Sequence, residues 1–426
     1  MALMSAQKLY IIVIFCVTLS TYVPLPSLAS NSKSDILSDS LQQREIIYVA
    51  GDGSGDFNCD SIADQVEINQ ALEFVQRKQN FTTVHLKGPH TYWINSTIYL
   101  PSDTIMQGDR NAVLKLVGDA GWWTKFKPLI SQKGSGGNNI KIRGFEIDGN
   151  RQNQKEPAGS SYYTLIQLAN CWNVTISDMY LDSGTNDLIR FYHDEPGHAV
   201  ASVFFNNVLK GSGHDGIYII NVNAVSVFNN QVTSSRTNSA IRITQGNHIK
   251  IYGNTCCNSL NRIPSGGPGI QIQGGGPGYP INHLEIHDNY ISGMGMMGIL
   301  LFGQGKYPIN LKRDAHIYNN YILSNHQGGI VINGFYKTLI ENNTIYDNFT
   351  KGGVVYEGTA GGGARYFTII RNNRITNTRK SGYGLNNASH QLHSFVPNNN
   401  CLYGNAVGAY NNASSKTDIL AESCIR

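Results

Sequence analysis

A unit of about 22 to 32 residues recurs along the chain from residue 138 onward, and a repeat of that size restricts the fold more than any other feature of the sequence. Each unit opens with an alternating polar and apolar run that ends in Asn or Asp, passes through a turn that is usually glycine-rich and closes with a second short alternation. The first runs include IKIRGFEIDGN (140–150), LEIHDNYI (284–291) and TIIRNNRI (368–375), and the second runs include DGIYI, SAIRI and GGIVI. Period-two runs separated by turns at this interval indicate a solenoid of short strands.

The gaps between the runs are too short for helical crossovers, so the strands must stack coil on coil. This predicts an all-β fold, a right-handed single-stranded parallel β-helix. We count about nine coils in residues 138–385 and expect roughly ten or more in the whole chain. Inward-facing aliphatic residues then form the core, and the recurring asparagines stack as a ladder at the turns. A homotrimer is the expected assembly by analogy with other elongated β-helices alone.

The N-terminal end of such a stack must be covered, because its strand edge would otherwise pair with other chains. Residues 62–77 have apolar side chains at positions 68, 71, 72 and 75, which is helical spacing and predicts an amphipathic cap. Residues 83–88, 92–100 and 112–118 have the pattern of the first strands.

Four segments follow from this organisation. Residues 1–30 form a signal peptide, 31–137 the cap and first coils, 138–385 the coil stack, and 386–426 a C-terminal coil or tail.

The first thirty residues have the pattern of an export signal. Lys8 supplies positive charge, residues 10–17 form an apolar core, and Ser27-Leu28-Ala29 matches a small-residue cleavage site. That core is shorter than the roughly 18 apolar residues of a membrane span, and no other stretch approaches this length. A retained N-terminal anchor is the alternative. We expect a secreted, extracellular or cell-surface protein without membrane contact beyond the signal peptide.

Sequons, cysteines and charge agree with export and exclude some functions. The chain has seven N-x-S/T sequons, at Asn80, Asn95, Asn173, Asn342, Asn348, Asn387 and Asn412. Six cysteines remain after cleavage, none in the CxxC spacing of zinc sites, and Cys401 with Cys424 could tie down the C-terminal tail. The net charge of +4 is mild and spread out, which argues against nucleic acid as the main partner.

The segment YVAGDGSGDFNCDSIADQVEINQALEFV (48–75) resembles the N-terminal region of methanosarcinal archaeal surface proteins, a group that includes the disaggregatases. TVHLKGPHTYWINSTIYLPSDTIMQGDRNAVLKL (83–116) does so too, and the resemblance is strong over residues 47–150 and looser through the coils. It implies a pectate-lyase-like fold and a secreted enzyme that loosens cell aggregates. The implied substrate is methanochondroitin, a chondroitin-like matrix polysaccharide of uronic acid and N-acetylgalactosamine. The group's catalytic residues cannot be placed by motif, and the group contains surface proteins of uncharacterised activity.

Alignment of the repeats on their second strands points to one candidate site. Asp187 falls under Asp215, and neighbouring coils lie about 4.8 Å apart, so the two carboxylates repel and the pKa of one should rise. Later coils carry glycine or small residues here, as in MMG (296–298), QGG (327–329) and KGG (351–353). We expect Asp187 and Asp215 as catalytic carboxylates, with His214 as acid, base or sugar ligand. Turn caps that bind backbone amides, or a bound structural cation, remain alternatives.

Polar and cationic residues surround this pair in about four adjacent coils, where Arg190, Tyr218, Arg242 and Gln271 face outward and later coils have Leu300, Val331 and Val355. Arginine matches a uronate carboxylate with two hydrogen bonds, and tyrosine stacks on a sugar face. We expect substrate contacts from a set that also includes residues beyond these strands and a second acidic row: Arg190, Tyr218, Arg242, Gln271, His193, Asp194, Gln245, Asp148 and Asp182.

Three functions fit these residues, with an acidic polysaccharide as the partner. The first is a glycoside hydrolase that uses two carboxyl groups. The second is a uronate lyase or epimerase, which needs a base at C5 and a cation beside the carboxylate. The third is a non-catalytic glycan-binding surface or matrix protein. No cofactor is expected, and calcium stays open; the Asp-rich GDGSGDFNCD (51–60) resembles a cation loop in composition but fits a turn or cap better.

Overall fold

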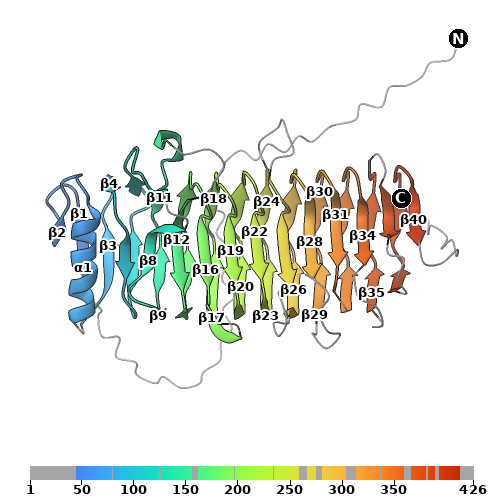
Figure 1. Cartoon of the computed structure of the whole chain (residues 1–426), viewed down its shortest axis with the longest axis horizontal. Helices are drawn as coiled ribbons and strands as arrows, with labels where there is room; N and C mark the ends of the chain where they lie inside the picture. Colours follow the sequence, from blue (N-terminus) through green and yellow to red (C-terminus); the bar gives the residue numbers. More distant parts are fainter. Residues whose placement is uncertain are drawn as a thin grey trace, which may run out of the picture. The chain divides into compact units, whose positions relative to one another are not determined.

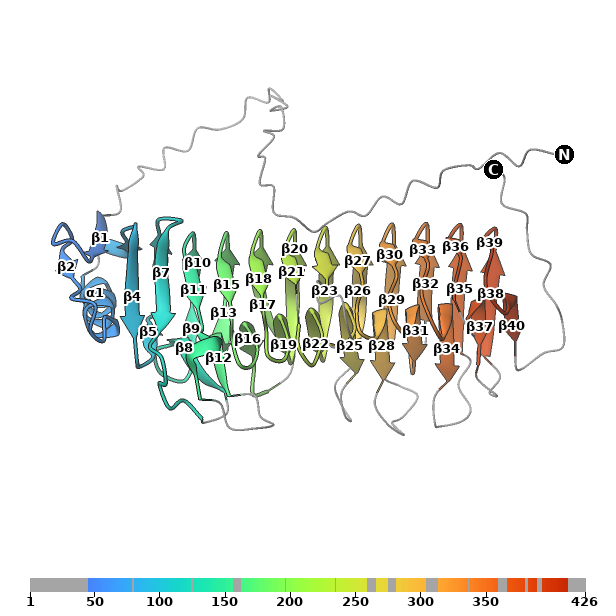
Figure 2. The same ribbon diagram turned by 90° about the horizontal axis from the view of Figure 1, so that it is seen from above.

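Three long parallel β-sheets form a β-helix, closed at its N-terminal end by one α-helix (Figure 1). The computed structural model describes residues 45–412, apart from 79, 124–125, 156–161, 196, 234, 259–265, 275–280, 304–312, 336, 359–365, 380–381 and 389–392. Seen from above, the strands of successive coils lie side by side from the first coil to the last (Figure 2).

Sheet A has fourteen strands. They are β1 (Glu45–Ala50), β2 (Phe57–Asn58), β3 (Phe81–Leu86), β6 (Ile105–Gly108), β10 (Lys141–Arg143), β14 (Thr175–Ser177), β17 (His198–Phe205), β20 (Val222–Phe228), β23 (Gly246–Tyr252), β26 (Ile281–His287), β29 (Arg313–Tyr318), β32 (Lys337–Glu341), β35 (Tyr366–Arg371) and β38 (His393–Asn398).

Sheet B has twelve strands. They are β4 (His90–Ile94), β7 (Ala112–Leu116), β11 (Glu146–Asp148), β15 (Tyr180–Asp182), β18 (Val208–Lys210), β21 (Gln231–Thr233), β24 (Thr255–Cys257), β27 (Tyr290–Ser292), β30 (Tyr321–Leu323), β33 (Thr344–Tyr346), β36 (Arg374–Thr376) and β39 (Cys401–Tyr403).

Sheet C also has twelve strands. They are β5 (Ile98–Leu100), β8 (Lys127–Gln132), β12 (Tyr163–Ala169), β16 (Ile189–Tyr192), β19 (Ile217–Ile220), β22 (Ile241–Thr244), β25 (Ile270–Gly274), β28 (Met297–Gly303), β31 (Gly328–Asn333), β34 (Gly352–Gly358), β37 (Tyr383–Asn387) and β40 (Gly408–Asn412). A short pair, β9 (Gly137–Asn138) with β13 (Cys171–Trp172), and one 3-10 turn (Arg151–Asn153) complete the described elements.

Each coil contributes one strand to each sheet, so the twelve strands of sheets B and C confirm the prediction of ten or more coils. The predicted strand 92–100 is divided between two sheets, because the chain turns a corner at Asn95 and Ser96. The sheets run without a break across the sequence boundaries drawn at 138 and 386. The segment boundaries at 138 and 386 therefore stay predictions from the sequence.

Alternation along the strands fills the interior. In β16, β19 and β22 the isoleucines and phenylalanine at odd positions are fully buried, while the residues between them face outward and are half-buried. Because the side chains of a strand point alternately to its two faces, one continuous hydrophobic core forms along the axis and leaves the outward positions free to vary.

Helix α1 (Gln65–Arg77) covers the first coil as the sequence predicts. Its buried apolar residues are Ile68, Ala71, Leu72 and Val75, the four positions whose spacing indicated a cap. The helix begins three residues later than expected, and Ile62 remains 74% exposed. Covering the first coil removes an unpaired hydrophobic edge.

The recurring asparagines form the predicted ladder at the corner between sheets A and B. Within it, each side-chain Nδ2 donates to the Oδ1 of the asparagine one coil further on, at 2.9 to 3.0 Å. The ladder comprises Asn207, Asn230, Asn254, Asn289, Asn320, Asn343, Asn373 and Asn400. These side chains are buried and bonded, so they serve the fold and not a polar site.

The asparagines of the sequons differ in exposure to solvent. Asn80, Asn95, Asn173 and Asn342 are exposed, whereas Asn348 and Asn387 are fully buried and closed to glycosylation in the folded protein. The side chain of Asn412 lies outside the described residues, as does the predicted signal peptide.

Cysteine chemistry differs along the chain. Cys401 is disulfide-bonded, and Cys424, its expected partner, lies outside the described residues. Cys59, Cys171 and Cys256 are buried thiols. Among the described residues, no helix is both long and apolar enough to span a membrane.

Candidate functional site

The strand register of sheet C confirms the alignment from which the site was predicted. Arg190 of β16 pairs with Tyr218 of β19, Tyr218 with Arg242 of β22, and Arg242 with Gln271 of β25. The same outward column continues through Leu300, Val331 and Val355 in β28, β31 and β34. The column is therefore apolar over these three strands and polar before them, and it becomes polar again at Asn386 of β37 and Asn411 of β40.

Asp187 and Asp215 lie two residues before β16 and β19, at the turns that enter sheet C, and both side chains are fully buried. One oxygen of each carboxylate accepts a backbone N–H bond from the next coil: Asp187 from Asp215 at 3.1 Å, and Asp215 from Ser239 at 2.9 Å. The backbone hydrogen bonds of the turn-cap alternative are thus present in the structure. Each of them uses only one of the two oxygens of its carboxylate.

His214 joins the two carboxylates. Its Nδ1 lies 3.0 Å from Oδ1 of Asp187 and 2.9 Å from Oδ2 of Asp215. Partial burial lowers the pKa of His214, but the hydrogen bonds and charges of the two aspartates outweigh it and raise the pKa to about 9. The ring is therefore an imidazolium at neutral pH. Its side chain is 33% exposed, so His214 is the member of the cluster that reaches solvent.

Burial acts on Asp215 in the opposite sense. The loss of water around its carboxyl raises the pKa of Asp215, the hydrogen bond from His214 lowers it, and the neighbouring Asp187 raises it further. The ligand atoms of the three residues lie within 4.8 Å of one another, close enough to hold a cation. In this arrangement the charged imidazolium already occupies the position between the carboxylates that a cation would take.

The second ring nitrogen of His214 faces a different neighbour. Nε2 lies 3.3 Å from Nδ2 of Asn238, and the same amide nitrogen donates to Oδ2 of Asp215 at 3.2 Å. An amide N–H₂ group is a donor and accepts no hydrogen bond. In the imidazolium, Asn238 therefore does not accept the Nε2 proton, which stays available to a substrate oxygen.

Cations and rings alternate beside this cluster. Arg190 donates to Oδ2 of Asp187 at 3.0 Å, and Nη1 of Arg242 lies 3.6 Å from Oδ2 of Asp215. Both guanidinium groups stack on Tyr218, with their Cζ atoms 4.9 and 4.6 Å from the ring centroid. Gln271 is turned toward Ser239, whose hydroxyl donates to it at 2.8 Å. These contacts hold both guanidinium groups beside the Tyr218 ring on the outer face of sheet C.

Phe126 adds a further aromatic ring to this stack. It was not predicted as a site residue from the sequence. Its ring centroid lies 4.2 Å from Cζ of Arg190, and the residue is 39% exposed with a φ of 60°. A bulky residue in this left-handed conformation is strained. Phe126 lies before β8 in a connection outside the repeats, so alignment of the repeats carried no signal for it.

His193, which was expected to contact substrate, lies buried and apart from this cluster. It is 2% exposed, its Nε2 lies 3.0 Å from the carbonyl oxygen of Cys171, and its ring packs edge-on against Trp172. Burial lowers the pKa of His193, so the ring is neutral. Its odd position after Ile189 and Phe191 already placed it on the inward face.

Asp194 and Gln245 lie at the other ends of their strands. They follow β16 and β22, whereas the aspartates precede β16 and β19. Asp194 is exposed and accepts a hydrogen bond from Asn170 at 2.7 Å. Asp194 lies four residues after Arg190, and Gln245 lies three residues after Arg242. These separations correspond to about 10 to 13 Å along a strand, so both residues lie at the far ends of their strands from Asp187 and Asp215.

The second acidic row lies on sheet B. Asp148 of β11 and Asp182 of β15 are register partners, flanked by Lys115 and Lys210 in the adjacent strands. Lys115 binds Asp148 at 2.7 Å, and burial raises the pKa of Asp182. The two acids therefore form a row, but they lie on another sheet than Arg190 and Arg242.

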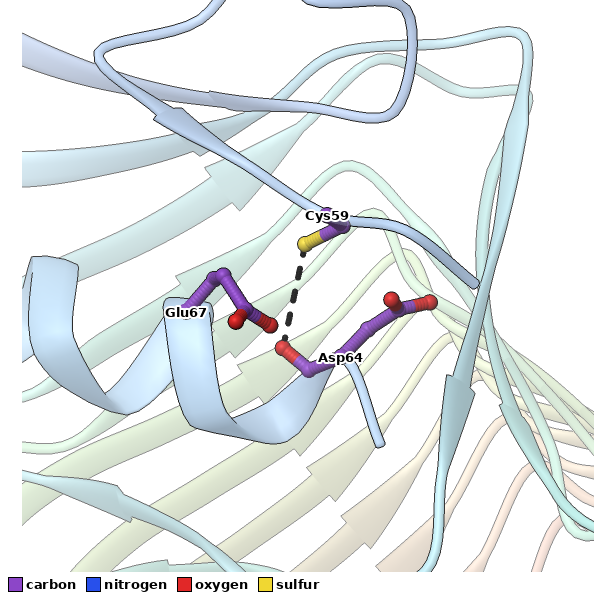
Figure 3. A group of neighbouring side chains, drawn as sticks. All are labelled: Cys59, Asp64 and Glu67. Atoms are coloured by element: carbon purple, nitrogen blue, oxygen red, sulfur yellow. Dashed lines mark hydrogen bonds between the residues drawn. The ribbon is translucent and has the colours of Figure 1, made fainter. Parts of the chain in front are cut away.

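A further cluster, Cys59, Asp64 and Glu67, lies at the N-terminal end of helix α1 (Figure 3). The thiol donates to the carbonyl oxygen of Asp64 at 3.8 Å, and the carboxylate of Asp64 accepts backbone bonds from Trp93 and Ser61 at 2.7 and 2.8 Å. Burial raises the pKa of Cys59 so far that the thiol stays protonated. The cluster therefore fastens α1 to the first coil.

The Asp-rich segment 51–60 forms the turn that was favoured over a cation loop. Oδ1 of Asp52 accepts the backbone N–H of Ser54 at 3.0 Å, and Oδ2 of Asp56 accepts the N–H of Tyr48 at 2.8 Å. These carboxylates already bond the backbone around them.

Two models of known protein families match parts of the chain. Residues 164–311 match the family model described as right handed beta helix region, which confirms the predicted handedness. Residues 281–425 match the family described as disaggregatase related. The chain therefore contains a disaggregatase-related domain, and that domain lies beyond the segment 47–150 in which the resemblance is strongest. No curated protein matches the sequence.

Solved structures share the fold at low identity. The A-module of mannuronan C-5 epimerase AlgE6 from Azotobacter vinelandii superposes with a TM-score of 0.60 at 18% identity, over 82% of this chain and 96% of that one. The catalytic domain of a GH87 alpha-1,3-glucanase gives 0.55 at 16%, over 83% and 66%. PfbA, a surface adhesin of Streptococcus pneumoniae, gives 0.55 at 13%, over 82% and 90%. The fold thus occurs in carbohydrate-active enzymes and in an adhesin, and it does not choose between them.

Proposed function

We propose that the protein cleaves an acidic polysaccharide outside the cell, as a glycoside hydrolase, and that His214 is its general acid. The observation that carries this proposal is a partly exposed imidazolium held between two fully buried carboxylates. A charged group fixed in one orientation, with one proton that the neighbouring amide nitrogen cannot accept, is what protonation of a leaving oxygen requires. The disaggregatase-related domain supports a matrix polysaccharide as the substrate.

In this mechanism His214 acts at one atom. Its Nε2 gives a proton to the glycosidic oxygen as the bond from that oxygen to the anomeric carbon breaks, and a water molecule supplies the hydroxyl group to that carbon. The proton released by the water goes to solvent, from which the imidazole is recharged. Asp187 and Asp215 do not touch the glycan, since neither is exposed. They are positioning residues that hold His214 and keep it charged.

The stack of Arg190, Tyr218 and Arg242 supplies recognition. Two guanidinium groups beside an imidazolium favour a carboxylate over a neutral hydroxyl, and the carboxylates of the site are already paired. A uronic acid unit is therefore the preferred sugar. Phe126 widens the same surface with an exposed ring on which a sugar face can pack.

A second candidate function is elimination or epimerisation at a uronate. The complete burial of Asp187 and Asp215 favours it, because hydrolysis by two carboxyl groups needs both at the substrate. Elimination breaks the bond to the leaving oxygen after a base removes the proton at C5, and the cations neutralise the carboxylate that would otherwise oppose this step. His214 would still protonate the leaving oxygen. A non-catalytic glycan-binding protein is the third candidate, and the shared fold of the adhesin supports it.

Incubation of the purified protein with chondroitin, followed by mass spectrometry of the products, distinguishes these functions. Products that have gained one water molecule support hydrolysis, and products with an unsaturated end that absorbs in the ultraviolet support elimination. Epimerisation leaves the mass unchanged and alters the NMR signals of the sugar ring. Binding without any of these changes would overturn the proposal in favour of the adhesin-like function.

A further inference from the structure

A pocket on sheet A, far from His214 in the sequence, combines charged and apolar side chains. It encloses about 340 Å³ and is lined by His283, Glu285, Asp314, His316, Lys337 and Leu339, among others. These residues come from β26, β29 and β32, and all of them fall within the disaggregatase-related domain. Ligand pockets span about 300 to 1,000 Å³, so this one suits a short segment of a chain.

The pocket lies beside the last of a row of β-bulge residues in sheet A. In β23 and β26, His248 and His283 occupy extra positions with φ of 56° and 52°, and their rings stack with centroids 4.4 Å apart. The register shifts between β26 and β29, because β29 lacks that extra residue. A β-bulge redirects the side chain it carries. The stacked row therefore ends at His283, which is exposed at the edge of the pocket and donates its backbone N–H to Asp314 at 2.7 Å.

His316 is the oriented group of this pocket. Its Nε2 lies 2.8 Å from Oε1 of Glu341, and the other oxygen of Glu341 accepts a bond from Arg371 at 2.5 Å. The bond from Arg371 lowers the pKa of Glu341, so the carboxylate stays charged and fixes the ring. His316 is 37% exposed, and Nδ1 is its remaining hydrogen-bonding atom.

The rest of the lining matches the chemistry of a sugar. Leu339 and Ile369 follow His316 in one outward column and offer an apolar surface to a pyranose face. Glu285, Asp314 and Nδ1 of His316 supply acceptors for hydroxyl groups, because Nε2 of His316 carries the proton that Glu341 accepts, while Lys337 supplies a charged donor for a carboxylate. This combination of a few polar groups around an apolar surface is typical of small ligand sites.

The geometry points to a second glycan-binding site here, one that takes a short acidic segment of a polysaccharide. The choice of an acidic glycan rests on the proposed function; the site itself rests on the pocket. A polymer that is held at sheet A while another segment lies at sheet C has a raised effective concentration at His214. The pocket would then matter for long substrates and not for short ones.

Histidine footprinting of the unmodified protein tests both sites at once. Diethyl pyrocarbonate labels exposed imidazoles, and a chondroitin tetrasaccharide serves as the probe. At about ten times its Kd, the probe leaves about a tenth of the sites free, so labelling of His283 and His316 should slow about tenfold. His326, outside both sites, is the internal control. Protection of His214 alone would overturn the second site, and protection of His283 and His316 alone would contradict the proposed function instead.

A matched pair of variants sharpens the test. Leu339→Trp fills the pocket, whereas Ser226→Trp places the same ring outward in the same register column of sheet A, four strands earlier. Leu339→Trp should abolish protection at His316 and raise KM for polymeric chondroitin, with KM for the tetrasaccharide unchanged. Ser226→Trp should change neither. Equal behaviour of the two variants would overturn the site.

Discussion

Two adjacent stretches of the outward column of sheet C, called here its polar and apolar halves, share one backbone and differ in chemistry. In the first, Arg190, Tyr218, Arg242 and Gln271 follow one another in register. In the second, Leu300, Val331 and Val355 continue the column, and with Met296 and Met297 they form a separate apolar cluster.

The turn before each strand differs in the same way. Asp187 and Asp215 precede the polar strands, whereas the register places Met297, Gly328 and Gly352 at the equivalent positions further on, where each is the first residue of its strand. Methionine is not the small residue that the sequence pattern suggested for the first of these. The comparison shows that one backbone accepts either chemistry in its outward column, where the polar stretch is half-buried and the apolar stretch packs into a buried cluster of its own.

The largest effect should come from the residue that distinguishes the polar half. We expect His214→Gln to lower turnover by about 10² to 10⁴, the usual contribution of a general acid, in an assay with polymeric chondroitin. Asp187→Asn should behave in the same way, and the double variant should be little worse than either, since the residues act as a unit.

The control for this prediction is His326→Gln, which removes an imidazole from the apolar half and should keep full activity. The His214 variant removes the cation that two buried carboxylates share and leaves them only Arg190 and Arg242, at a cost of up to about 3 to 5 kcal/mol, so melting curves must show that it is folded at the assay temperature. Full turnover by folded His214→Gln would remove this group from the mechanism.

Transplanting a polar residue into the apolar half should damage the fold. Val331 is fully buried, and in Val331→Arg its place is taken by a charge without a partner, which we expect to cost several kcal/mol of the free energy of unfolding. Chemical denaturation measures this loss. Val331→Ile, which keeps the apolar character, is the matched variant and should change stability by less than about 1.5 kcal/mol. An unchanged midpoint in the arginine variant would mean that the two halves are interchangeable.

Removing a guanidinium group from the polar half should act on binding. Hydrogen bonds to charged groups are worth about 1.5 to 3 kcal/mol, so Arg242→Ala should weaken binding of a uronate oligosaccharide about 10- to 150-fold. Isothermal titration with a neutral oligosaccharide of equal length is the control, and it should show little change. Equal losses for both ligands would assign Arg242 to the shape of the wall and not to recognition of charge.

The smallest effect is on the pH dependence of stability. The folded state raises the pKa of His214 from 6.5 to about 9, so the charged ring stabilises the protein fully below about pH 6.5, and this stabilisation is lost as the pH rises through 9. The melting temperature should fall over that interval. His214→Gln should lack this component, and parallel curves for the two proteins would contradict the assigned charge.

The fold could be predicted almost completely because it repeats. Alternation predicted the inward residues, and the constant turn predicted the asparagine ladder. The same parity, if applied to His193, places on the inner face a residue that was expected from the sequence to contact substrate. The site was harder to predict, since alignment located Asp187 and Asp215 but could not show that His214 turns back between them.

Features outside the repeat carried no signal at all. Phe126 reaches Arg190 from a connection before β8, and the pocket beside His283 depends on a register shift between two strands. Such a shift follows from the backbone of two neighbouring coils and is not visible in either coil alone.

The asparagine ladder has a consequence for how such a chain can change through evolution. Successive ladder residues are separated by 23, 24, 35, 31, 23, 30 and 27 positions, yet their amide contacts stay within 2.9 to 3.0 Å. One corner of every coil is thus held constant while the length of the rest varies by up to half. Insertions between sheet C and the next strand of sheet A would leave the ladder intact, so new loops can be gained or exchanged coil by coil without a new fold.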